Sequence, residues 1–126
     1  MDARQYVAHL LQALGISRCY CGYNMAVDAV LLVLQNEDVL HNIRRQVYVP
    51  VAARRNSNWY CVERDMRTVI QRAWQINAEL LQQMALYPLE VAPTVKEFIE
   101  IVAVYAMRHA PHEVLEEVGQ TQMCPV

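Results

Sequence analysis

The stretch NSNWYCVERDMRTVIQRAW, residues 56–74, decides how this chain folds. It begins with Asn56, Ser57 and Asn58, which are residue types that favour turns, and either Ser57 or Asn58 is expected to cap a following helix. From residue 59 to residue 74 the apolar side chains recur at spacings of three, four and seven. That spacing predicts an amphipathic helix directly after the turn.

The two sides of this predicted helix differ in chemistry. The apolar side is formed by Trp59, Val62, Met66, Val69, Ile70 and Ala73. The polar side is formed by Tyr60, Glu63, Arg64, Arg67 and Gln71. Arginine can form two hydrogen bonds with guanine, a carboxylate can accept one from cytosine, and a glutamine amide can pair with adenine. These five are therefore the candidate base-reading residues.

The pattern supports two interpretations. In the plainer one, which the pattern alone favours, the helix only packs, its polar side is solvated, and Glu63 forms an i, i+4 ion pair with Arg67. In the other, a preceding helix that carries Arg54 and Arg55 completes a helix-turn-helix within about residues 44–74, whose second helix enters the major groove of DNA.

The charges along the chain are unevenly distributed. Residues 44–72 carry seven arginines and two acids, a net of +5, and the rest of the chain carries four basic and eleven acidic residues, a net of −7. This asymmetry predicts a basic surface on an acidic body. The candidate phosphate contacts are Arg44, Arg45, Arg54, Arg55 and Arg72, together with the turn residues Ser57 and Asn58.

The rest of the sequence predicts a single all-α domain. The chain has 126 residues, of which 55% are hydrophobic, and strand-like alternation is scarce. Helices are expected at residues 3–14, ended by Gly15, and at residues 23–34. Another helix is expected from residue 36, and Pro50 either interrupts it or starts a short helix that contains residues 51–55. Later helices are expected at residues 59–74, 77–84 and 94–108 and in part of 111–118. Thr94 and Glu97 are expected to form a capping box at the start of the long later helix. The core spans about residues 3–110, and the tail 119–126 is expected to be flexible.

Other classes of function have little support in the sequence. No apolar run approaches 18 residues and the N-terminus does not suit a signal peptide, so the protein is expected in the cytoplasm with reduced thiols. Cys19 and Cys21 are too close for the usual zinc pair, and Pro111 breaks the spacing between His109 and His112. We therefore expect no metal, no cofactor and no enzymatic activity.

Three blocks of the sequence share residues with a known family: GISRCYCGYNMAVDAV (15–30), VYVPVAARRNSNWYCVERDMRTVIQRAW (47–74) and PTVKEFIEIVA (93–103). The shared residues are Gly15, Gly22, Tyr23 and Ala29; Tyr48, Ala52, Asn56, Val62, Glu63, Arg64, Arg67, Ile70, Ala73 and Trp74; and Pro93, Thr94, Glu97, Phe98, Ile99, Val102 and Ala103. Over about residues 10–109 the chain thus resembles the C-terminal DNA-binding effector domain of the sporulation-initiation response regulator of endospore-forming Firmicutes.

The resemblance implies an all-α domain of about six helices with an embedded helix-turn-helix, in the winged-helix-like response-regulator effector superfamily. It further implies sequence-specific binding to a short promoter element, with copies arranged head to tail. In that family the residues that match Glu63 and Arg64 read bases. The sequence departs from the family at Tyr60-Cys61 (Ser-Arg), Asp65 (small apolar), Thr68 (His) and Arg55 (aromatic), and it lacks the family's receiver domain.

The leading functional hypothesis is sequence-specific binding of double-stranded DNA and regulation of transcription. Further expected partners are a second copy of the chain on DNA, RNA polymerase and a full-length regulator, with no membrane. The alternative is a protein-interaction module of the same fold that has lost DNA binding and modulates a full-length regulator. The exposed Tyr60 and Cys61 favour that alternative.

Overall fold

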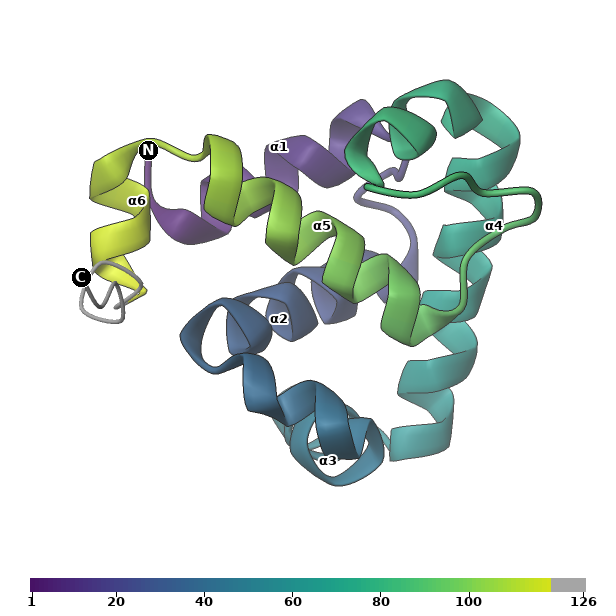
Figure 1. Cartoon of the computed structure of the whole chain (residues 1–126). Helices are drawn as coiled ribbons and strands as arrows, with labels where there is room; N and C mark the ends of the chain where they lie inside the picture. Colours follow the sequence, from purple (N-terminus) through teal and green to yellow (C-terminus); the bar gives the residue numbers. More distant parts are fainter. Residues whose placement is uncertain (119–126) are drawn as a thin grey trace.

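Helix α2 (Cys21–Gln35) lies at the centre of the fold in the computed structural model, which describes residues 1–118. Ten of its fifteen residues are buried, and it packs against α1, α4 and α5 (Figure 1). Its second half is apolar on all sides, which is the pattern expected of a helix surrounded by others. The remaining helices are therefore placed by the surfaces they offer to α2.

Helix α1 (Ala3–Ala13) has clear signals at both ends. Asp2 and Gln5 form a capping box at its start. At its end Gly15 has a φ of +92°, and the Ile16 amide donates to the Leu11 carbonyl oxygen at 3.0 Å. This is a Schellman ending, in which glycine adopts the left-handed conformation without strain. The prediction of Gly15 as the stop residue is confirmed.

Residues 37–54, which precede the turn, form three short helices of different types. A 3-10 helix (η1, Glu37–Asn42) leads into a π-helix (η2, Arg44–Tyr48) and then α3 (Val49–Arg54). The amide of Val49 donates to the carbonyl oxygen of Arg44, five residues back. Pro50 falls in the first turn of α3, where a missing N–H is tolerated because those donors have no partner within the helix. Pro50 thus restarts a helix.

Helix α4 (Trp59–Met84) continues through the two helices expected at 59–74 and 77–84. The backbone of Asn77 departs from helical geometry, at φ −145° and ψ 57°, so a kink lies where the sequence predicted a break. Its side-chain amide donates to the Ala13 carbonyl oxygen at 3.1 Å and accepts from the Leu80 amide at 3.2 Å. Asn77 therefore caps the second half of α4 and ties it to the end of α1.

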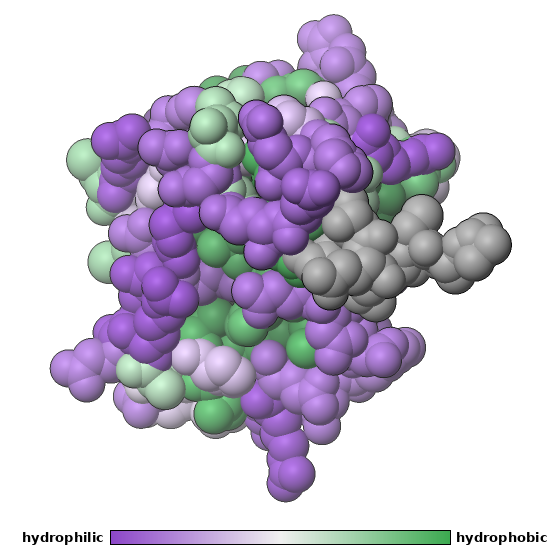
Figure 2. Space-filling view, turned by 90° about the vertical axis from the view of Figure 1, so that its left-hand side faces the viewer, coloured by the Kyte–Doolittle hydropathy of each residue, from purple (hydrophilic) through white to green (hydrophobic). Residues whose placement is uncertain are grey.

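The chain returns to the core through an irregular loop, residues 85–94, and helix α5 (Val95–His109). The predicted capping box of Thr94 and Glu97 is present at the start of α5. A short helix α6 (His112–Glu117) then lies against α1 (Figure 1). The molecular face on that side is mostly hydrophilic, with apolar patches between the polar side chains (Figure 2). The flexible tail predicted at 119–126 lies outside the described residues.

The all-α fold class is confirmed. Residues 1–118 contain no β-strand, so α4 is followed by the loop 85–94 rather than by a β-hairpin wing. Helix α3, the turn 55–58 and the first half of α4 form the helix-turn-helix, and α3 packs on α4. Asn58 occupies the N-cap position of α4, but its side chain makes no capping hydrogen bond.

The turn depends on Asn56, which has a φ of +55° and is the one non-glycine residue with positive φ among residues 1–118. We predict that Asn56→Ala lowers the free energy of unfolding by about 1 kcal/mol, because alanine tolerates the left-handed region less well than asparagine. Asn56→Gly should change it far less. Urea unfolding of both variants checks this, and equal stability of Asn56→Ala and the parent would contradict it.

Candidate nucleic-acid interface

The buried side of α4 matches the sequence prediction. Val62, Met66, Val69, Ile70 and Ala73 are each at most 1% exposed, and Trp59 is partly buried against the core. Burying a side chain of this size contributes roughly 1.5–3 kcal/mol relative to leaving it in water. This packing fixes the rotation of α4 about its axis. The opposite side of the helix must then face outward.

The outward side carries the five candidate base-reading residues. Tyr60, Arg64, Arg67 and Gln71 are exposed, and Glu63 is partly exposed at one border of the stripe. The two arginine side chains are 68% and 62% exposed. The structure therefore brings all five together on three turns of one helix, directly after the turn.

Ion pairs within α4 hold both arginines of this stripe. Arg64 donates through Nε to Asp65 at 3.3 Å, and this hydrogen bond raises the pKa of Arg64 above its ordinary value. Arg67 donates through Nη2 to Glu63 at 2.8 Å, the i, i+4 pair that the plainer interpretation predicted. Among the described residues the terminal nitrogens of Arg64 have no hydrogen-bond partner, so its guanidinium still offers the two donors that guanine binds.

The remaining departures from the family pattern lie beside this stripe. The Thr68 hydroxyl donates to the Arg64 carbonyl oxygen at 3.1 Å, so it is used within the helix. Cys61, a free thiol, is half-buried at the position where the family pattern has an arginine. Asp65 is mostly covered, with a side chain 20% exposed. The outward surface of α4 is thus less basic than the family pattern implies.

The candidate phosphate contacts surround α4 on several elements. Arg44 and Arg45 lie on η2, Arg54 ends α3 and Arg72 lies further along α4, and all four are exposed. The Arg44 guanidinium stacks over the Trp59 ring, 4.0 Å from its centroid. This cation–π contact holds a positive charge next to the start of α4. Of the turn residues, Asn58 is exposed and Ser57 half-buried.

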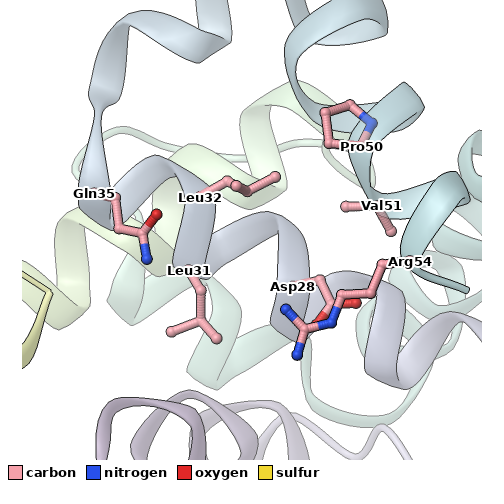
Figure 3. A pocket seen from close by; sticks show the side chains of 7 residues that line it. All are labelled: Asp28, Leu31, Leu32, Gln35, Pro50, Val51 and Arg54. Carbon is pink, nitrogen blue, oxygen red and sulfur yellow. The ribbon is translucent and has the colours of Figure 1, made fainter.

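Arg55 takes a different place from the one expected. Its Nε and Nη2 donate to the two oxygens of buried Asp28 at 2.7 and 3.0 Å, and Arg4 of α1 donates to the same carboxylate. The Arg54 Nε lies 3.9 Å from the Asp28 carboxylate, and both side chains line an open pocket of about 260 Å³ (Figure 3). Arg55 therefore links the turn to α2, because its guanidinium is occupied by a buried carboxylate. This geometry does not support its assignment as a phosphate contact.

Asp28 has opposing influences on its charge. Burial raises the pKa of its carboxyl. The hydrogen bonds and positive charges of Arg55 and Arg4 together lower the pKa by more than burial raises it, so it lies below the ordinary value. The carboxylate is therefore ionised at neutral pH. A charge within the apolar run of α2 is a signal that could have pointed to this link, since a buried carboxylate needs a cationic partner.

A second feature missed by the sequence analysis is a groove of about 380 Å³ beside the outward stripe. It lies between α4, which contributes Glu63, Arg67 and Gln71, and the segment 92–96 at the start of α5. Tyr48 lines it as well, and Lys96 is the last residue of the segment 92–96. Lys96 is the only lysine of the chain, but its proximity to α4 comes from tertiary packing that no local pattern reveals.

Other constellations offer no competing site within residues 1–118. No group of three or more His, Cys, Asp or Glu side chains could hold a metal ion there. His109 stacks on Tyr105 with ring centroids 4.3 Å apart, and His112 lies 3.0 Å from Glu116. None of the described helices is both long and apolar enough to cross a membrane.

A comparison with known protein families agrees with this geometry. Residues 7–106 match the family described as "Sporulation initiation factor Spo0A C terminal", a helical DNA-binding domain of regulators of transcription in sporulation. The match runs from within α1 to nearly the end of α5 and includes the whole helix-turn-helix. This protein therefore belongs to the Spo0A C-terminal family of DNA-binding domains.

Proposed function

We propose that this protein binds double-stranded DNA sequence-specifically and regulates transcription, with the first half of α4 in the major groove. The observation that carries the proposal is the outward stripe of Tyr60, Glu63, Arg64, Arg67 and Gln71, held in place by the buried opposite side of the helix. Arg64 is the principal base-reading residue, because its side chain is 68% exposed and its terminal nitrogens have no partner within residues 1–118. A DNA-binding function places the protein with the chromosome, in the cytoplasm.

Phosphates on either side of the major groove are held by Arg44, Arg45, Arg54 and Arg72, with Ser57 and Asn58 as neutral donors in the turn. Each neutralised phosphate releases counterions, so the logarithm of affinity falls with the logarithm of salt concentration by about 0.9 per contact. Four such contacts predict a loss of roughly a hundredfold in affinity between 50 and 200 mM salt.

We predict that Arg64→Ala weakens binding to the best site by about 10- to 100-fold, because a bidentate arginine–guanine pair contributes about 1–3 kcal/mol of discrimination. The preferred site is first selected from genomic fragments, and fluorescence anisotropy then measures affinity for it and for single-base variants. The discrimination at one base pair should disappear in Arg64→Ala. Arg108→Ala, an exposed arginine at the far end of α5, is the control and should bind as the parent does.

The alternative function, a protein-interaction module, draws on a different observation. Tyr60 is 56% exposed at the N-terminal end of the stripe, and Asp65 binds Arg64, so this surface is less basic and more apolar than a typical DNA-reading helix. A partner would then be a full-length regulator, a second copy of the chain or RNA polymerase. If the parent binds no genomic fragment even at low salt, the DNA-binding proposal fails and this alternative replaces it.

A further inference from the structure

The groove between α4 and the start of α5 joins part of the base-reading stripe to Tyr48 and Lys96, two residues that neither DNA-binding residue set above includes. Tyr48 forms its inner wall, Glu63, Arg67 and Gln71 line one side, and residues 92–96 line the other. Its volume of about 380 Å³ and its open mouth admit a group larger than a water molecule. It lies at the edge of α4 that carries Arg67 and Gln71.

Tyr48 points to a ligand in this groove. The residue is only 4% exposed, and no side-chain hydrogen bond among the described residues involves its hydroxyl. Within residues 1–118, every side-chain nitrogen or oxygen that is inaccessible to solvent has a hydrogen-bond partner. The Tyr48 hydroxyl has none, so it is accessible to solvent, and Tyr48 lines the groove. Burial and nearby Glu63 raise the pKa of Tyr48 to about 12, so this hydroxyl stays protonated and remains a donor.

The start of α5 supplies further donors. The amide of Glu97 donates to the Thr94 hydroxyl at 3.2 Å, and that of Phe98 to the Thr94 carbonyl oxygen at 2.8 Å. The amides of Val95 and Lys96 have no such partner in the described residues, and both residues line the groove. The first N–H groups of a helix, with the positive end of its dipole, favour an anion. At fifteen residues, α5 is long enough to have this property.

The charges around the groove also favour an anion. Arg67 and Lys96 are positive, and Glu63 is negative but already paired with Arg67 at 2.8 Å. The formal sum of these three groups is +1, and the Lys96 ammonium and the Tyr48 hydroxyl are both hydrogen-bond donors. An acceptor with several oxygens, such as a phosphate, satisfies the Tyr48 hydroxyl, the α5 amides and the Lys96 ammonium together.

We propose that this groove binds a backbone phosphate of DNA at the edge of the recognition helix, with Tyr48 and Lys96 as its contact residues. The inference rests on the proposed function, because the strand that supplies the phosphate is the one beside α4 in the major groove. The groove shares the Arg67 and Gln71 edge of α4, so a DNA strand alongside the base-reading stripe passes its mouth. Phosphate contacts of this kind fix the register of a protein on the duplex.

The test measures affinity against salt for Lys96→Gln, with Arg108→Gln as the matched control at the exposed far end of α5. Lys96→Gln should make the log–log slope shallower by about 0.9 on every DNA sequence, whereas Arg108→Gln should leave it unchanged. Tyr48→Phe should weaken binding roughly three- to tenfold without lowering the melting temperature, since the hydroxyl has no hydrogen-bond partner within residues 1–118. If the Tyr48 hydroxyl has only a structural role, Tyr48→Phe will lower the melting temperature and leave the affinity for DNA unchanged.

The single lysine allows a direct probe. Acetylation of the free protein with an amine-specific reagent modifies Lys96 and the N-terminal amine, and DNA should slow the reaction at Lys96 alone. Inorganic phosphate at millimolar concentration should not reproduce this protection. Protection by inorganic phosphate instead would assign the groove to a free anion and overturn the proposal.

The failure of this inference can be told apart from failure of the proposed function. If the parent binds DNA selectively, but Lys96→Gln and Tyr48→Phe keep its slope and affinity, the groove takes no phosphate while base reading by α4 stands. If the parent binds no DNA at all, both proposals are wrong.

Discussion

Gly22→Val should lower the free energy of unfolding by about 3 kcal/mol and the melting temperature by roughly 10 °C. Gly22 lies in the first turn of α2, buried against α4. A Cβ atom added there would lie 2.4 Å from the backbone oxygen of Asp65 and 3.0 Å from a methyl group of Val69. The carbonyl of Asp65 is part of α4, so the clash is relieved only if the two helices move apart.

Gly22→Val also raises the helix propensity of α2, but this stabilising effect is smaller than the cost of the clash. Replacing glycine in a helix gains at most about 1 kcal/mol of helix propensity, and valine gains less than alanine does. Asn24→Val, at an exposed position of the same helix, is the control for introducing valine into α2 without a clash, since asparagine and valine have similar helix propensities. Thermal unfolding followed by circular dichroism compares the two variants. If Gly22→Val melts within 2 °C of Asn24→Val, the close approach of α2 to α4 is not limiting.

Asp28→Ala should cost about 2–3 kcal/mol, because it leaves the guanidinium of Arg55 without its carboxylate. Removing one partner of a buried pair usually costs about 3–5 kcal/mol, but Arg55 and Arg4 keep side chains that are 30% and 36% exposed and regain some water. Asp38→Ala is the control, since that carboxylate is 85% exposed. The double variant Asp28→Ala/Arg55→Leu should lose less than Asp28→Ala, because only the more exposed Arg4 is then left without its carboxylate.

The pH dependence of this effect has a definite sign. The pKa of Asp28 is lower in the folded protein than its ordinary value, so the carboxylate stabilises the fold above the unfolded pKa of about 3.9. That contribution is lost as the pH falls through the folded pKa. Urea unfolding should therefore show a smaller advantage of the parent over Asp28→Asn near pH 3 than at pH 7. An advantage that grows on acidification would show that Asp28 is not held as a carboxylate.

The helix boundaries and the outward stripe of α4 follow from local patterns. The apolar spacing of residues 59–73 determined which side of α4 is buried, because each apolar side chain gains free energy by leaving water. Gly15 and the Thr94 capping box could be recognised because their roles involve residues no more than five positions away. Pro50 was recognisable as an interruption, but the π-helix before it was not, since wide turns have no strong sequence signal.

Contacts between distant segments could not be predicted in the same way. Arg55 has the charge of a phosphate contact, and only the folded chain shows that Asp28, 27 residues earlier, binds it. Lys96 and Tyr48 are 48 positions apart, and they share a groove because α5 packs against α4. A charged side chain can bind either DNA or another residue of its own chain, and its residue type does not decide between them.

The sequence by itself determined an all-α chain and which side of helix α4 is buried, because hydrophobic periodicity acts over a few neighbouring residues. Tertiary structure alone decided that Arg55 binds a buried carboxylate while other arginines stay exposed. It also decided that a groove lined by Tyr48 and Lys96 opens beside α4. Those outcomes depend on which distant groups approach within a few ångströms, and hydrogen bonds and ion pairs require that proximity.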